Sequence, residues 1–291
     1  MVSPIARFPP FLRKRGKGPT LRVLSPESAV ALHCRDQGRG EPVLLLHGLG
    51  NSGRDWEFQE PDLIAAGYRV LAPDLRGFGH SPRPPRGYRI EQFAADVRGL
   101  LAERGVERAH LVGYSMGGAV AYQLAVDEPA RWISLNLISS VPSFRPERPI
   151  DYWQYFVRIL GTHCFGMSRI AHAVTHKLFA DDPALRRKMQ PRYAANDRGV
   201  YIRILTALAR WDVRGRLPTI ACPVLILAAE NDYFRLEDVR EAMAGLPQAR
   251  LKVIPGTRHG LPMEAPTPVN QALLAAMSAA SSACSDSASL V

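Results

Sequence analysis

Short apolar runs alternate with longer amphipathic stretches along most of the chain. An unbroken apolar run of strand length is typical of a strand buried on both faces of a parallel sheet. The expected strands are residues 42–46, 69–72, 109–112, 133–138, 223–228 and 250–254, and the expected helices are residues 51–66, 90–104, 116–126 and 264–279. Their alternation predicts the α/β class with a parallel sheet and right-handed crossovers.

The alternation stops between about residues 141 and 217. This stretch is rich in aromatic and basic residues, has helical periodicity at residues 152–160, 170–179 and 199–211, and contains no strand-like run. We interpret it as a helical insertion, because the strand pattern resumes at Pro223.

The two ends of the chain have a different character. Residues 20–24 and 29–35 read as two short strands of an opening hairpin, separated from the next expected strand by a polar, glycine-rich turn at residues 36–40. Ten of the last fourteen residues are Ser or Ala, which predicts a frayed or disordered tail. The expected organisation is a basic leader (1–19), a core (20–140 and 218–279), the insertion (141–217) and the tail (280–291).

The composition is that of a soluble globular protein. Of 291 residues, 46% are apolar and 22% are charged. No run of eighteen uncharged apolar residues occurs, and the first thirty residues lack the apolar core of a signal peptide, so we expect neither membrane insertion nor classical secretion but a cytoplasmic protein. The cysteines form no Cys-x-x-Cys pair, which argues against a zinc site or a redox motif; they are Cys34, Cys164, Cys222 and Cys284.

The net charge of +10 is unevenly distributed. Residues 1–22 hold six cations and no acid, residues 141–217 hold fourteen cations and six acids, and the remainder of the chain is therefore slightly acidic at −4. Charge alone would suggest nucleic acid or a membrane surface as partner. No aromatic-basic nucleic-acid signature accompanies it, and a short basic arm without an apolar anchor binds membranes weakly, so neither partner is expected.

A candidate nucleophile lies at Ser115. The segment Gly113-Tyr114-Ser115-Met116-Gly117 directly follows an expected strand and opens an expected helix. A serine on such a tight turn has strained backbone dihedrals and close neighbours, which explains the flanking glycines, and the helix N-terminus favours the anion that develops during attack. The alternative is an ordinary loop serine.

Together with this segment, two further motifs resemble the α/β-hydrolase family over about residues 20–279. His47-Gly48-Leu49-Gly50 is similar to the family's oxyanion loop, and the segment from Pro73 to Ser81 (PDLRGFGHS) is similar to the loop after the next strand. The resemblance implies the α/β-hydrolase fold, with a mostly parallel central sheet, helices on both faces and an inserted helical cap. We expect the segment from Pro73 to Ser81 to be structural.

The resemblance also implies the partners of Ser115. Family order places an acid and then a histidine after the serine, and His259, on the loop between the last strand and the last helix, matches the base. Asp232 matches the orienting acid, although the segment Ala229-Glu230-Asn231-Asp232 departs from the family's Gly-x-x-Asp turn. Glu230 and Asp238 are the local competitors. His47 matches a histidine that is structural in the family, and the insertion holds His163, His172 and His176, which either line a cavity or lie on the surface.

The backbone N–H groups of Met116 and Leu49 are the expected oxyanion-hole donors. The expected function is a serine hydrolase of an ester, thioester, lactone or related acyl compound, with no cofactor and no metal. A carbon–carbon bond hydrolase of ring-cleavage products and a ligand receptor with little turnover are the alternatives. The expected partner is a small acyl substrate. Whether the basic insertion attracts an anionic substrate or forms a solvated face stays open at this point, as does the oligomeric state.

Overall fold

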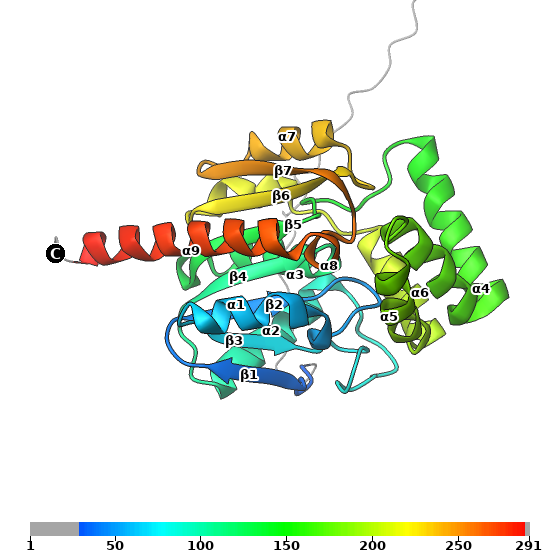
Figure 1. The fold of residues 1–291 in the computed structure, drawn as a ribbon, viewed down its shortest axis with the longest axis horizontal. Coiled ribbons are helices and arrows are strands. Elements are labelled where there is room, and N and C mark those ends of the chain that lie inside the picture. Colours follow the sequence, from blue (N-terminus) through cyan, green and yellow to red (C-terminus); the bar gives the residue numbers. More distant parts are fainter. Residues whose placement is uncertain (1–28, 289–291) are drawn as a thin grey trace, which may run out of the picture.

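The computed structural model describes residues 29–288, so the expected leader (1–19) and the first expected strand (20–24) lie outside the described residues. Within this part of the chain, seven strands form one sheet in the order β1-β3-β2-β4-β5-β6-β7 (Figure 1). β1 (Cys34–Gly38) pairs antiparallel with β3 (Arg69–Pro73), and the other neighbouring strands are parallel. The predicted α/β class with a mostly parallel sheet is confirmed.

The inner strands lie close to the apolar runs that predicted them. They are β2 (Pro42–Leu46), β4 (Ala109–Tyr114), β5 (Trp132–Ile138), β6 (Val224–Asn231) and β7 (Ala249–Arg258). The prediction for the first edge strand is partly wrong, because β1 begins at Cys34 and continues through Asp36, where a turn was expected. The side chain of Arg69 on β3 donates two hydrogen bonds to Asp36, at 2.9 and 2.7 Å, which stabilises this polar residue at the sheet edge.

Alternate side chains of the strands enter two separate cores. Leu44 and Leu46 of β2 belong to one buried cluster, whereas Val43 and Leu45 belong to the other, as expected for a strand covered on both faces. The first cluster is covered by α2 (Ile90–Glu103), α3 (Met116–Asp127) and α7 (Leu236–Met243), and the second by α1 (Glu60–Ala65) and α9 (Pro266–Ala288) (Figure 1).

Two helical predictions differ from the structure. The expected helix at residues 51–66 is divided into a 3-10 helix (Gly53–Phe58) and α1, whose first turn contains Pro61. The expected end of the last helix at residue 279 is also wrong, because α9 continues to Ala288. Its extension packs against the sheet: Ala280 is buried, and the hydroxyl of Ser281 lies 3.2 Å from Nε2 of His110 on β4. A Ser- and Ala-rich segment without glycine or proline can continue a helix when such contacts are available.

Three helices lie together between β5 and β6 in the sequence, beside the sheet at the right of Figure 1. They are α4 (Pro149–Leu178), α5 (Pro183–Ala194) and α6 (Arg198–Leu208), preceded and followed by loops within the predicted insertion. Gly166, at φ 74° and ψ 175°, interrupts the helical geometry of α4 and separates the two stretches that periodicity predicted there. The outer face of α4 leaves Trp153, Phe156 and Phe165 exposed. None of the helices within residues 29–288 is sufficiently long and apolar to span a bilayer.

Candidate active site

Ser115 occupies a strained turn between β4 and α3. Its φ of 52° and ψ of −115° lie outside the regions that a non-glycine residue ordinarily adopts. The N–H of Ser115 donates to the carbonyl of Ile138 at 2.9 Å, and the hydroxyl of Ser140 donates to the carbonyl of Ser115 at 2.9 Å. Two hydrogen bonds from the neighbouring strand end therefore hold the strained residue in place.

The glycines on either side of Ser115 permit a close approach of backbones. A Cβ atom at Gly113 would lie 2.6 Å from the carbonyl oxygen of Gly117, and one at Gly117 would overlap the carbonyl oxygen of Leu46 on β2. The first residues of α3 therefore pack directly on β2 and β4. The Gly-x-Ser-x-Gly pattern is explained here by steric exclusion at both glycine positions.

The structure brings Ser115, His259 and Asp232 into one hydrogen-bonded chain. Nε2 of His259 lies 2.8 Å from Oγ of Ser115, and Nδ1 lies 2.6 Å from Oδ1 of Asp232. An ionised carboxylate can only accept, so Nδ1 carries the proton and Nε2 accepts from the serine hydroxyl. Because these residues follow β4, β6 and β7, the C-terminal ends of three parallel strands position them at one edge of the sheet.

The environment of Asp232 keeps it ionised. Burial raises the pKa of Asp232, but its interaction with His259, which includes a hydrogen bond, and the backbone N–H of Phe234 outweigh burial and hold that pKa below its usual range. The backbone N–H of Tyr233 also donates to Oδ1, at 2.6 Å.

The competing acids have other partners. Glu230 accepts from the backbone N–H of Gly256 at 2.8 Å, and Asp238 pairs with Arg235 at 2.6 Å. Neither carboxylate is hydrogen-bonded to His259, so geometry favours Asp232 as the residue that orients the imidazole.

Aromatic rings that the sequence did not identify enclose His259. The ring centroids of Tyr233, Tyr114 and Phe234 lie 4.5, 5.6 and 5.6 Å from that of the imidazole, and only 6% of His259 is exposed. Tyr233 and Phe234 directly follow Asp232, and Tyr114 directly precedes Ser115. Their positions next to the expected acid and nucleophile could therefore have identified them in the sequence.

The predicted oxyanion-hole donors lie beside Ser115. Met116 is the first residue of α3, and an N–H in the first turn of a helix has no acceptor within that helix. Leu49 follows Gly48, whose backbone approaches the nucleophile so closely that a Cβ there would lie 3.4 Å from Cβ of Ser115. Met116 and the Gly48-Leu49 segment thus adjoin Ser115, and the role of their N–H groups as oxyanion-hole donors stays a prediction.

His47 fixes the loop that carries Leu49. Its Nε2 accepts from the backbone N–H of Leu75 at 2.9 Å, so its Nδ1 carries the proton and donates to the carbonyl of Gly48 at 2.9 Å. Burial lowers the pKa of His47, which keeps the ring neutral. The other candidate histidines, His163, His172 and His176, are all exposed.

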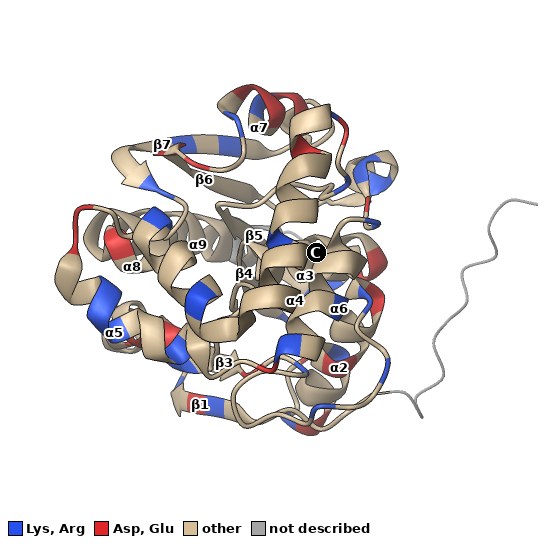
Figure 2. Ribbon diagram, turned by 90° about the vertical axis from the view of Figure 1, so that its right-hand side faces the viewer, with Lys and Arg blue, Asp and Glu red and all other residues tan. Residues whose placement is uncertain are grey.

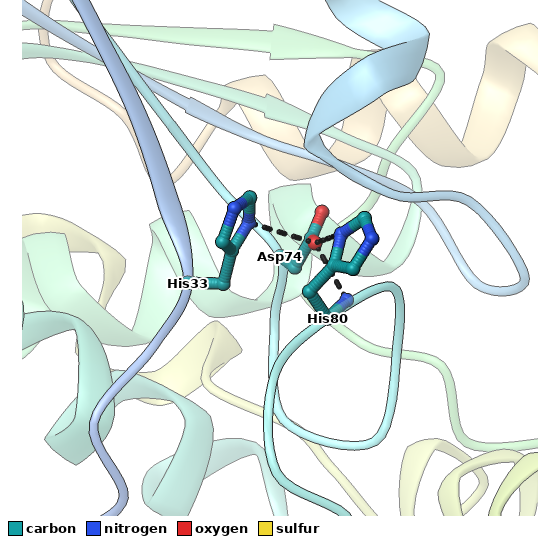
Figure 3. A group of neighbouring side chains, drawn as sticks. All are labelled: His33, Asp74 and His80. Atoms are coloured by element: carbon teal, nitrogen blue, oxygen red, sulfur yellow. Dashed lines mark hydrogen bonds and ion pairs between the residues drawn. The ribbon is translucent and has the colours of Figure 1, made fainter.

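Asp74 anchors the segment from Pro73 to Ser81. Its carboxylate accepts from the backbone N–H of His80 at 2.8 Å and from Nδ1 of His33 at 3.1 Å (Figure 3). It also accepts from the backbone N–H of Gly53 at 2.8 Å. Burial raises the pKa of Asp74, but the hydrogen bonds from the backbone N–H groups of His80 and Gly53 help to lower it overall. The ligand atoms of His33, Asp74 and His80 lie within 4.8 Å of one another, the arrangement nearest to a metal site within residues 29–288. Because both carboxylate oxygens already accept loop hydrogen bonds, we assign this cluster to loop anchoring.

Arg76 ties the same segment to α2. It forms a buried ion pair with Asp96, with 2.5 Å between Nε and Oδ2, and donates to the carbonyl of Gly87 at 2.6 Å. Its side chain is only 1% exposed. The guanidinium is therefore buried in the core, where it supports the loop.

Side chains of α5 and of the residues just after it pack onto the loop that carries Gly48 and Leu49. The hydroxyl of Tyr193 donates to Oδ1 of Asn51 at 2.6 Å, and the side-chain amide of Asn196 donates to the carbonyl of Gly50 at 2.8 Å. Gly50 has a φ of 84°, and a Cβ there would lie 2.9 Å from Cδ1 of Tyr193. Residues of the insertion therefore contact the loop beside Ser115. No sequence motif predicted these particular contacts.

Comparison with known proteins supports these observations. A model of the alpha/beta hydrolase family matches residues 43–272. RutD of Variovorax paradoxus (strain S110), named as a carbamate hydrolase, is 32% identical over 255 residues, which cover 81% of this chain and 91% of RutD. The 2-hydroxy-6-oxo-6-phenylhexa-2,4-dienoate hydrolase of Burkholderia cepacia is 29% identical over 247 residues, which cover 78% and 84% of the two chains.

A solved structure agrees with the fold as well. The thermophilic esterase of Thermogutta terrifontis, in its malate-bound form, superposes with a TM-score of 0.75 at 30% identity and covers 83% of this chain and 91% of the esterase. The family match spans both the sheet and the helices inserted between β5 and β6. The chain belongs to the alpha/beta hydrolase family.

Proposed function

We propose that the protein is a serine hydrolase that cleaves an ester, thioester, lactone or related acyl compound through an acyl-enzyme. The observation that carries this proposal is the hydrogen-bonded chain from Asp232 through His259 to Ser115, built on a strained serine. A serine hydroxyl becomes an effective nucleophile only when a base removes its proton, and this geometry provides that base.

The proposed reaction proceeds in two stages. Oγ of Ser115 attacks the substrate carbonyl while Nε2 of His259 takes the hydroxyl proton, and the same proton is then delivered to the leaving group. Water, deprotonated by His259, attacks the acyl-enzyme, and His259 returns that proton to Oγ of Ser115 as the bond to the acyl group breaks and the acid leaves. Asp232 keeps the proton on Nδ1 and stabilises the imidazolium that forms in each stage.

The developing oxyanion needs fixed donors. The backbone N–H groups of Met116 and Leu49 are proposed to supply them, since Met116 opens α3 and Leu49 lies on the loop that His47 holds. One such donor is generally worth about 3 to 4 kcal/mol of transition-state stabilisation.

Helices α4, α5 and α6 are proposed to form a cap that encloses the substrate. The contacts of Tyr193 and Asn196 with the oxyanion loop support this assignment. The similarity to the dienoate hydrolase of Burkholderia cepacia favours carbon–carbon bond cleavage as the second candidate reaction, since that relative is named as a hydrolase of a ring-cleavage product. Turnover of a dienoate but of no aryl ester would select this second reaction.

The proposal is tested with 4-nitrophenyl butyrate as substrate. The wild type is expected to release 4-nitrophenol steadily, and Ser115→Ala is expected to lose about 10⁴-fold or more of kcat with an unchanged Tm. Ser282→Ala is a matched control, because it removes an exposed serine hydroxyl that donates to the carbonyl of Ser278 in α9. Equal activity of the wild type and Ser115→Ala would contradict the assignment.

A further inference from the structure

Several cations of the insertion are paired with acids. Figure 2 shows Lys and Arg distributed along α4, α5 and α6. Ion pairs join Arg192 to Asp55 at 2.6 Å and Arg214 to Asp212 at 2.6 Å. Further pairs of the same kind are Arg148 with Asp151, Lys188 with Glu57, and Arg216 with Asp127. In these pairs, a carboxylate of the protein itself balances the positive charge of each cation.

Arg158 on α4 is different. Its side chain is partly buried, and it donates through Nε, at 2.9 Å, and through Nη2 to one acceptor, the neutral phenol oxygen of Tyr201. Among the residues that the structure describes, no carboxylate lies within 4.0 Å of its nitrogens. A guanidinium withdrawn from water without an anionic partner is costly, so an occupant of the site that supplies the anion would be favoured.

A second cation of α4 lies near Arg158. Nζ of Lys177 lies 4.2 Å from the ring centroid of Tyr233 and pairs with no carboxylate among the described residues. Lys177 is itself exposed, and partial desolvation together with the positive charge of Arg158 lowers its pKa. Arg158 and Lys177 lie on the two segments of α4 that the non-helical Gly166 separates.

Both cations are one aromatic ring away from the candidate active site. Tyr201, which contacts Arg158, packs against the oxyanion loop, where a Cβ at Gly50 would lie 3.6 Å from its ring. Tyr233, which contacts Lys177, lies with its ring centroid 4.5 Å from that of His259. The positive charge therefore lies beside the space in which the substrate must place its reacting carbonyl.

We propose that Arg158 and Lys177 form an anion subsite and that the substrates are acyl compounds carrying a second, ionised carboxylate. The inference rests on the proposed serine hydrolase function and adds a substrate class to it. A planar guanidinium and an ammonium match the two oxygens of a carboxylate. Tyr201, the partner of Arg158, packs in an apolar cluster with Tyr155, Met167 and Ile170, so an acyl chain that places its carboxylate at Arg158 meets apolar surface beside it.

The test compares two esters with the same leaving group, 4-nitrophenyl butyrate and the mono-4-nitrophenyl ester of adipic acid. In Arg158→Met, kcat/KM for the adipate ester is expected to fall about 10- to 100-fold, mainly through KM, while kcat/KM for the butyrate ester changes less than about twofold. Lys177→Gln should show the same selectivity with a smaller loss. Arg158→Lys should recover part of it, because the charge remains but the planar fork is lost.

Arg169→Gln is the matched control, since it removes one exposed positive charge from the same helix. Free adipate should inhibit hydrolysis of the butyrate ester in the wild type and less so in Arg158→Met. An ester with its carboxylate on the leaving group, 4-(butyryloxy)benzoate, tests the other side of the carbonyl. Selective loss with either charged ester supports the subsite and assigns its side.

Several results would overturn the inference. An equal loss of kcat/KM for charged and neutral esters in Arg158→Met would show that Arg158 has a structural role. A loss for the charged ester in Arg169→Gln as large as that in Arg158→Met would show a general effect of the positive charge of α4. If the wild type hydrolyses the butyrate ester but Arg158→Met discriminates against neither charged ester, the subsite is wrong and the hydrolase proposal stands. If the wild type hydrolyses no ester and Ser115 is unreactive, the proposed function itself fails.

Discussion

The sheet and the inserted helices contribute to the candidate site in different ways. The sheet provides Ser115, Asp232 and His259 from the ends of β4, β6 and β7, where side-chain hydrogen bonds join the three residues. The helices α4 and α6 provide long side chains, such as Arg158 and Tyr201, that reach the same space from above the strand ends. The proposed function therefore assigns the reaction type to the sheet and the substrate choice to the insertion.

The largest effect should follow from a change in the sheet. Asp232→Asn is expected to lower kcat by about 10⁴-fold, because an amide no longer holds the proton on Nδ1 of His259. Glu230→Gln, two residues earlier on the same strand, should leave kcat within about twofold of the wild type, since Glu230 contacts Gly256 and not His259. Steady-state kinetics on one neutral ester checks both. Similar losses in the two variants would refute Asp232 as the orienting acid.

The next largest effect is expected from breaking the buried ion pair between Arg76 and Asp96. Arg76→Met should lower the free energy of unfolding by about 3 to 5 kcal/mol, because Asp96 would stay buried without its partner. Burial already raises the pKa of Asp96 even with Arg76 present. Urea unfolding monitored by tryptophan fluorescence measures the loss. A loss below about 1 kcal/mol would mean that the pair adds little to the loop that it joins to α2.

Acidification should weaken the sheet side more than the insertion. The pKa of Asp74 is lowered in the folded protein, so its stabilising contribution is complete above the unfolded value of about 4 and is lost as the pH falls through the folded value. Asp74→Asn should therefore show a shallower fall of the free energy of unfolding between about pH 5 and pH 3. Asp151→Asn on α4 should change this slope less, because solvent screens the pair with Arg148. Equal slopes for Asp74→Asn and the wild type would contradict the assignment.

The smallest effect is expected where the insertion meets the sheet. Arg192→Gln removes contacts at 2.6 Å with Asp55 and 2.8 Å with Glu57, and should lower the free energy of unfolding by about 1 kcal/mol. Hydrogen exchange should accelerate in α5 before it accelerates in β4 and β5. Uniform acceleration throughout the chain would show that the insertion and the sheet unfold as one cooperative unit.

The same division explains what the sequence could predict. Ser115, Asp232 and His259 lie at strand ends, where short apolar runs and glycines mark the backbone, so their positions follow from the local pattern and the family resemblance. Arg158 is one of fourteen cations in a helical region with no distinguishing spacing. Arg158 differs from the others because it is partly buried and has no carboxylate among its described neighbours. Both features result from the packing of α4 against α6, which the sequence does not show. The length of α9 was missed for a related reason, because contacts beyond Ala280 favour helix where composition favoured a tail.

The central claim, that Ser115 is an activated nucleophile, is tested most directly by covalent labelling with a fluorophosphonate followed by peptide mass spectrometry. We predict one adduct per chain, located on Ser115, which forms rapidly in the wild type, slowly in His259→Ala and not at all in Ser115→Ala. An unmodified wild type, or an adduct that persists in Ser115→Ala, would contradict the claim.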